Sequence, residues 1–109
     1  MDQMNEQELL KQFHIFWDEF PGPVRLIDKN HRVIASNGIA EKKGFIAGVC
    51  CAAVGEPCSH RGCKASLMLK SGKAQTDRPA NDRIRGWVPL QGYPNVYVHY
   101  TLTLPEDTL

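Results

Sequence analysis

Residues 23–44, PVRLIDKNHRVIASNGIAEKKG, carry the pattern from which the rest of the chain can be interpreted. Two β-rich runs, Val24 to Asp28 and Arg32 to Ser36, flank three turn-forming residues, an interval of the right length for a hairpin. A short helical stretch from Ile39 to Lys43 follows, and Gly44 is expected to close it as a C-terminal cap. The stretch therefore predicts two paired strands and then a short helix.

The C-terminal third of the chain predicts three more strands. They run from Lys73 to Arg78, from Arg83 to Leu90 and from Asn95 to Leu104, with residues 91–94 connecting the last two. Apolar and polar residues alternate in the last strand, which is the period of a strand with one apolar face. A helical segment from Cys63 to Lys70 precedes these strands. The expected fold class is α+β, a five-stranded antiparallel sheet with short helices on one face.

The N-terminal residues predict an amphipathic helix from Asn5 to Phe20, ended by the Pro21-Gly22-Pro23 sequence. Its apolar stripe is strongly aromatic and must be covered, either by the domain's own sheet or by the same helix of a second copy. The stripe, which is the candidate dimer interface, consists of Leu9, Phe13, Phe16, Trp17 and Phe20. We therefore divide the chain into residues 1–20, a capping or dimerisation helix, and residues 21–109, one domain.

Size and charge exclude several classes of protein. A chain of 109 residues suffices for one hydrophobic core, and 42% hydrophobic with 23% charged residues is ordinary for a globular domain. A formal net charge of +1 gives no electrostatic case for nucleic acid or an anionic membrane as partner. No apolar run approaches the length of a membrane span, and the N-terminus lacks the pattern of a secretion signal. We expect a cytoplasmic protein.

All four cysteines lie in residues 50–63, CCAAVGEPCSHRGC. Such a cluster in a reducing compartment indicates metal binding or redox chemistry before it indicates disulfides. The candidate metal or redox residues are Cys50, Cys58, Cys63 and His60. Cys51 is disfavoured, because adjacent helical residues point about 100° apart and do not reach one metal easily.

Three interpretations of these cysteines stay open. They could hold zinc or an iron–sulfur cluster, although their spacing departs from the paired spacing of structural zinc sites. Cys58 and Cys63 could instead form a redox-responsive thiol pair, with His60 and Arg61 lowering a thiol pKa. The cysteines could also be small buried hydrophobes without any cofactor, which is the preferred interpretation of Cys51.

His99, Trp87 and Tyr97 are further candidates, for a ligand pocket or an interface. His99 lies on the predicted strand face opposite the apolar one, which favours a surface or interface position for it. Trp87 and Tyr97 are of the types that supply much of the binding energy in dimer interfaces. Arg78, Arg83 and Arg85 lie near Asp77 and Asp82, a pattern most simply explained by solvated, salt-bridged strands.

The order of residues 23–44 resembles the opening of a PAS domain. The resemblance rests on Asp28 at the end of the first strand, on Asn37 leading into the first short helix, and on Gly44 after that helix. It extends over about residues 21–104. It implies the PAS fold and a sensor in signal transduction with a signalling partner protein, whereas the homodimer that we expect rests on the aromatic stripe of the N-terminal helix.

The middle segment also resembles a cysteine-bearing subgroup of bacterial PAS sensor domains, through Gly48, Cys50, Pro57-Cys58 and Cys63. Cys51 stands where an aromatic residue is expected, and four residues separate Cys58 from Cys63 where two are usual.

We therefore expect a PAS-like module that senses a small molecule, a metal or redox state and acts through protein–protein contacts. The first alternative is a structural or interaction module whose cysteines bind a metal only for folding. The second is a small thiol-dependent enzyme. The sequence contains no phosphate-binding loop, zinc-protease helix or nucleophile elbow, and we expect no enzymatic activity.

Overall fold

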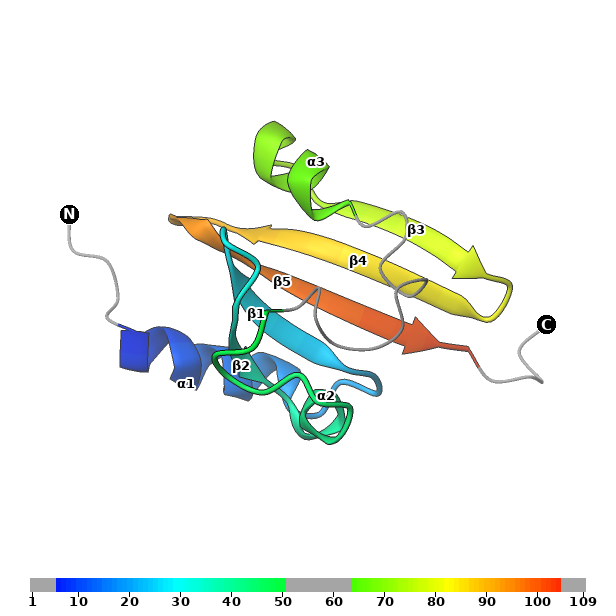
Figure 1. Ribbon diagram of the computed structural model, residues 1–109, viewed down its shortest axis with the longest axis horizontal. Coiled ribbons are helices and arrows are strands. Elements are labelled where there is room, and N and C mark those ends of the chain that lie inside the picture. The colour runs from blue at the N-terminus through cyan, green and yellow to red at the C-terminus, as the bar shows by residue number, and fades with distance from the viewer. Residues whose placement is uncertain (1–5, 51–63, 105–109) are drawn as a thin grey trace.

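One five-stranded antiparallel sheet organises the chain (Figure 1). The computed structural model describes residues 6–50 and 64–104. The strands, in the spatial order β2-β1-β5-β4-β3, are β1 (Val24–Asp28), β2 (Val33–Ser36), β3 (Gln75–Ala80), β4 (Arg83–Leu90) and β5 (Tyr93–Thr103). The first and last thirds of the chain meet at the centre of the sheet, where β1 pairs with β5. The predicted fold class is confirmed.

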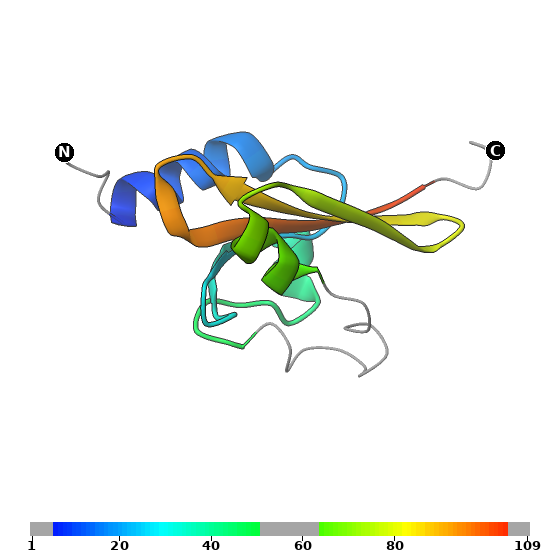
Figure 2. The ribbon, with the colours of Figure 1, turned by 90° about the horizontal axis from the view of Figure 1, so that it is seen from above.

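The three described helices lie on both faces of the sheet (Figure 2). Helix α1 (Glu6–Trp17) covers one face, which we call the outer face. Helices α2 (Gly38–Lys42) and α3 (Ala65–Ser71) lie on the other, which we call the inner face. The short helices therefore share one face, as expected. None of the described helices is long and apolar enough to cross a membrane.

The core is divided by the sheet into two clusters. On the outer face, Phe13 of α1 packs against the buried Val24, Leu26 and Val98. On the inner face, Ala65 and Met68 of α3 pack against the buried set Ile27, Trp87 and Tyr97. Period-2 alternation along β1 and β5 sends neighbouring side chains to opposite faces, so both clusters draw on the same strands.

Element bounds differ from the predicted ones mainly at the ends. Helix α1 ends at Trp17, three residues before the predicted Phe20, and a turn follows it. Strand β5 begins at Tyr93, so Tyr93 and Pro94, predicted to lie in a connection, belong to the strand. The actual β4–β5 turn is Gln91-Gly92, and Gly92 has the positive φ of 86° that such a tight turn favours.

Candidate functional site

A row of side chains crosses the inner face from one edge of the sheet to the other. Residues directly opposite one another in antiparallel strands project to the same face. The pairings Arg25↔Ser36, Arg25↔His99, His99↔Trp87 and Trp87↔Gln75 therefore place one residue of every strand in this row. Its buried members are Ser36, Arg25, His99 and Trp87, and Gln75 at the β3 edge is half-buried.

His99 is at the centre of this row and is only 7% exposed. The expectation of a surface position is wrong, because Tyr97, Val98 and His99 are all buried and both faces of β5 are therefore covered. The His99 ring stacks on Trp87, with ring centroids 4.7 Å apart and an interplanar angle of 8°. Its Nδ1 donates to the Gly86 carbonyl at 2.8 Å, since a carbonyl can only accept. Stack and hydrogen bond together fix the orientation of the ring.

Arg25 lies directly across from His99 and is 4% exposed. Its Nη2 donates to Thr101 Oγ1 at 3.3 Å, and its guanidinium carbon lies 4.2 Å from the centre of the Phe45 ring. A buried arginine is rare because removing its charge from water costs roughly several kcal/mol. Interactions with its partners must offset this cost. The buried Arg25 charge is thus held at the centre of the sheet by Thr101 and Phe45.

Arg85, which is buried, and Asp77, which is half-buried, form a second polar group two pairs further along β3 and β4. Arg85 Nε donates to Asp77 Oδ1 at 2.9 Å, and Arg85 Nη2 donates to Asp77 Oδ2, which is the bidentate geometry of a strong ion pair. The Arg85 guanidinium also lies over Trp87, 5.3 Å from the ring centre. With side chains 9% and 17% exposed, this pair is not the solvated one that the sequence suggested.

Tyr97 lies on the same inner face, next to Trp87 in the second core cluster, and is 2% exposed. Its hydroxyl is 3.0 Å from Nδ1 of His31, in the β1–β2 turn. His31 has a φ of 66°, and its backbone N–H donates to the Asp28 carbonyl. The turn therefore places a titratable ring at the end of the inner face.

Trp87 presents a buried donor without a described acceptor. The side chain is 0% exposed, and within residues 6–50 and 64–104 the indole Nε1 has no hydrogen-bond partner. A buried unsatisfied donor costs about 1–3 kcal/mol, so its presence needs an explanation beyond packing. Burial places Trp87, Tyr97 and His99 inside the chain, and their roles in a ligand pocket or an interface stay predictions.

Asn37 connects the two faces. It is fully buried, and its Oδ1 accepts from the backbone N–H groups of Val24 at 3.1 Å and of Ala40 at 3.0 Å. Its Nδ2 donates to the carbonyls of Gly22 at 2.9 Å and Trp17 at 3.3 Å. One side chain thus caps α2, holds the start of β1 and holds the C-terminal end of α1.

Most of the predicted cysteine site lies outside the described residues. Cys51, Cys58, His60 and Cys63 belong to that part of the chain. Cys50 is half-buried and forms an isolated antiparallel bridge with Arg32. Among the described residues no three histidine, cysteine or acidic side chains gather as a metal site would require. Metal binding and redox chemistry at the cysteines stay predictions.

The predicted dimer stripe of α1 divides into a buried and an exposed part. Phe13 is 4% exposed, and Leu9, Trp17 and Phe20 pack partly buried against the outer-face cluster. Phe16, in contrast, is 71% exposed. The stripe therefore covers the chain's own sheet and leaves one aromatic side chain in solvent.

The order of strands and the position of the short helices define a PAS-like α+β domain. The chain is similar in structure to a sensory box sensor histidine kinase from Vibrio cholerae, with a TM-score of 0.64 over 94% of this chain and 97% of that one, at 9% identity. It is also similar to the PAS domain from Bordetella pertussis BvgS, with a TM-score of 0.56 over 90% and 87% of the two chains, at 13% identity. No protein-family model and no curated protein matches the chain. These likenesses show that the chain has the fold of a PAS domain, as the sequence resemblance implied.

Proposed function

We propose that this chain is a signalling module that senses a small molecule at the inner face and passes the change to a partner protein. The observation that carries the proposal is the buried row Arg25–His99–Trp87. Buried charged and polar groups are expensive, and apolar residues of similar volume often give equal or greater stability. A sheet face that keeps an arginine, a histidine and an indole N–H inside the molecule is better explained by ligand recognition than by stability.

The chemistry of the row indicates the kind of ligand. Trp87 and His99 present aromatic rings, and the Trp87 indole presents an N–H donor that has no acceptor among the described residues. These groups match a small molecule with hydrogen-bond acceptors on a planar frame. The similarity of the fold to domains of a sensor kinase and of BvgS supports a signalling role.

Asn37 supplies a physical route from the inner face to α1. It joins the first turn of α2 to the C-terminal end of α1 through Ala40 and Trp17. A ligand that moves α2 by differential contacts would change the backbone groups that Asn37 can hold, and so the position of α1. Signal output through α1 is therefore part of the proposal.

The two tryptophans of the chain provide the test, because they report on different faces. Trp87 is buried on the inner face, and Trp17 lies in the cluster under α1 on the outer face. Indole N–H resonances can be recorded by ¹H–¹⁵N NMR, assigned with Trp87→Phe and Trp17→Phe, and followed against a library of small organic acids and planar heterocycles. A ligand of the proposed site is expected to shift the Trp87 resonance much more than the Trp17 resonance.

The test variant is Arg25→Met, which removes the guanidinium and keeps the approximate length of the side chain. It is expected to weaken binding of any compound that shifts Trp87. The proposal would be contradicted if no compound of the library shifted the Trp87 resonance. It would also be contradicted if Arg25→Met bound such a compound as tightly as the wild-type chain does.

A further inference from the structure

A cavity lies under α1, on the face of the sheet opposite the proposed sensing site. It has a volume of about 250 Å³ and is bounded by α1, the outer face of the sheet and the β4–β5 turn. An apolar cavity of about 150 Å³ can hold a benzene molecule, whereas sites for drug-sized ligands begin at roughly 300 Å³. The volume under α1 therefore fits a molecule of one or two rings.

Helix α1 supplies one wall of this cavity, and the wall is largely aromatic. Its lining residues recur at helical spacing, which places them on one side of the helix. They are Leu9, Gln12, Phe13, Phe16 and Trp17. The Trp17 ring is held by a stack on Tyr100, with ring centroids 6.4 Å apart, and by an edge contact with Phe20 at 5.6 Å. Because aromatic rings pack well against other rings in edge-to-face or offset geometry, this wall favours an aromatic ligand over an aliphatic chain.

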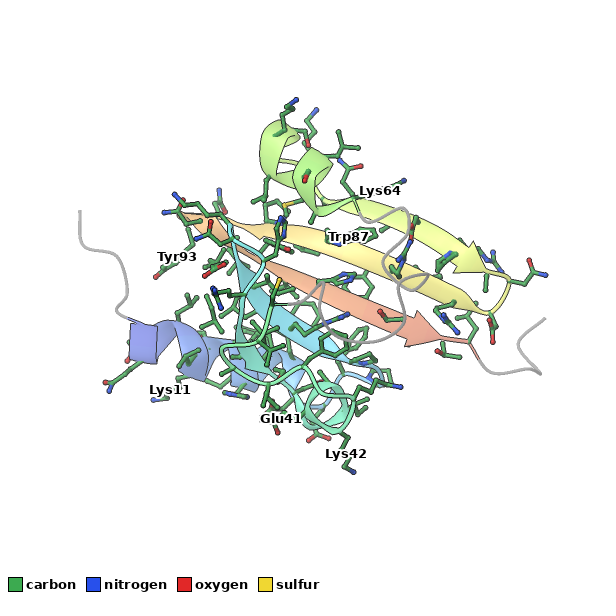
Figure 3. The ribbon with its side chains drawn as sticks, viewed as in Figure 1. Lys11, Glu41, Lys42, Lys64, Trp87 and Tyr93 are labelled. Atoms are coloured by element: carbon green, nitrogen blue, oxygen red, sulfur yellow. The ribbon has the colours of Figure 1, made fainter. Side chains whose placement is uncertain are left out.

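No charged side chain is found among the described residues that line the cavity. Leu26 and Val98 line it from the sheet, and both are buried. Lys11, next to Gln12 in the sequence, lies on the side of α1 away from the sheet (Figure 3). A charged ligand would lose its hydration here without gaining a counter-charge, which is costly. The walls therefore favour an uncharged ligand.

The opening of the cavity carries polar groups. Phe16 and Gln91 both line the cavity and are exposed, so the cavity reaches solvent where these two residues lie. Gln91 and the half-buried Gln12 bring side-chain amides to the lining, and an amide both donates and accepts hydrogen bonds. A ligand with one hydroxyl or ring N–H can bond to these amides while its rings lie against the apolar walls.

We infer that the cavity under α1 is a second binding site, which takes an uncharged molecule of one or two aromatic rings with a single hydrogen-bonding group. The site is separated from the inner face by the sheet and does not rest on the sensing proposal. Its ligand would contact Trp17, whose carbonyl accepts from Nδ2 of Asn37 at 3.3 Å. Because Asn37 also caps α2, a ligand in the cavity would act on the same connection between the two faces.

The first test locates the binding of 2-naphthol, a two-ring phenol, by ¹H–¹⁵N NMR of the full chain. Trp17 lines the cavity and Trp87 is buried on the opposite face. The probe is therefore expected to shift the Trp17 indole resonance saturably and to leave the Trp87 resonance nearly unchanged. The matched control compound is 2-naphthoate, which has the same two rings and a carboxylate. It is expected to bind at least about tenfold more weakly.

The second test fills the cavity by substitution. Leu9→Trp is expected to raise the dissociation constant of 2-naphthol, measured by isothermal titration calorimetry, at least about tenfold, because the larger ring takes the place of the ligand. Leu90→Phe, which fills the cavity from the end of β4, is also expected to weaken binding. Leu10→Trp is the matched control, since Leu10 is half-buried like Leu9 and is not among the lining residues. Circular dichroism and thermal melting establish that all three variants are folded.

The inference would be overturned if 2-naphthol left the Trp17 resonance unchanged up to its solubility limit, or if both filled variants bound it as tightly as the wild-type chain does. Equal binding of 2-naphthoate would overturn the assignment to uncharged ligands. A Trp17 resonance that moves with protein concentration before the probe is added would identify a second copy of the chain as the occupant instead. A shift of the Trp87 resonance alone would overturn this inference and support the sensing proposal, so the failure of each can be recognised separately.

Discussion

The two faces of the sheet are both buried, but by different kinds of side chain. On β5, Val98 is 1% exposed on the outer face, and its neighbour His99 is 7% exposed on the inner face. On β1, Leu26 and Arg25 form the same contrast, at 0% and 4%. The outer face excludes water with aliphatic and aromatic groups, whereas the inner face buries two arginines and a histidine as well. This unequal chemistry under equal burial distinguishes the two faces, and the proposed sensing at the inner face rests on it.

The largest effect is expected on the outer face. Leu26→Ala removes a fully buried side chain that packs against Phe13 and Val98, and leaves a cavity that the sheet cannot close. We expect a loss of about 4 kcal/mol in the free energy of unfolding, measured by urea denaturation. Leu67→Ala is the control at a half-exposed position and should change this free energy by less than about 0.5 kcal/mol. Similar losses in the two variants would contradict an outer-face core.

The alternation of residues predicted the sheet well but could not predict what covers each face. The bounds of β1 and β4 agree with the predicted ones residue for residue, because β-rich runs there are flanked by clear turn signals. His99 was expected at the surface, since alternation distinguishes two faces without showing which is covered. Its burial depends on tertiary contacts, including the stack on Trp87 from a neighbouring strand.

Long-range partners of single side chains were equally beyond the sequence. Arg25 and Asn37 carried no signal of burial, because each is placed by contacts far along the chain, Arg25 with Thr101 and Asn37 with Trp17 and Gly22. Asn37 was recognisable as the start of a short helix, and its capping bond to Ala40 agrees with that interpretation. An Asn before a helix is a local signal in the sequence, whereas the bonds of Asn37 to Trp17 and Gly22 are not.

A smaller effect is expected where the faces are joined. Asn37→Ala removes four hydrogen bonds and leaves buried backbone groups at Val24, Gly22 and Ala40 without their partner. We expect a loss of about 2 to 3 kcal/mol and faster hydrogen exchange at the C-terminal end of α1. Asn37→Ser, which can still cap α2, should recover part of the stability but not the protection of α1. Unchanged hydrogen exchange in α1 in both variants would contradict the coupling of α1 to α2 through Asn37.

The smallest effect is expected from removing the inner-face ion pair as a whole. Asp77→Leu or Arg85→Met alone leaves one poorly solvated charge and should lower the free energy of unfolding by about 1 to 2 kcal/mol. The double variant should have a free energy of unfolding within about 1 kcal/mol of the wild-type value. A double-mutant cycle in urea measures the difference. If the double variant instead loses as much free energy of unfolding as the two single variants together, Asp77 and Arg85 stabilise the fold as the outer-face residues do. If the double variant recovers nearly the wild-type stability, the fold does not need this ion pair. The presence of the pair on the inner face would then have to be explained by what that face binds.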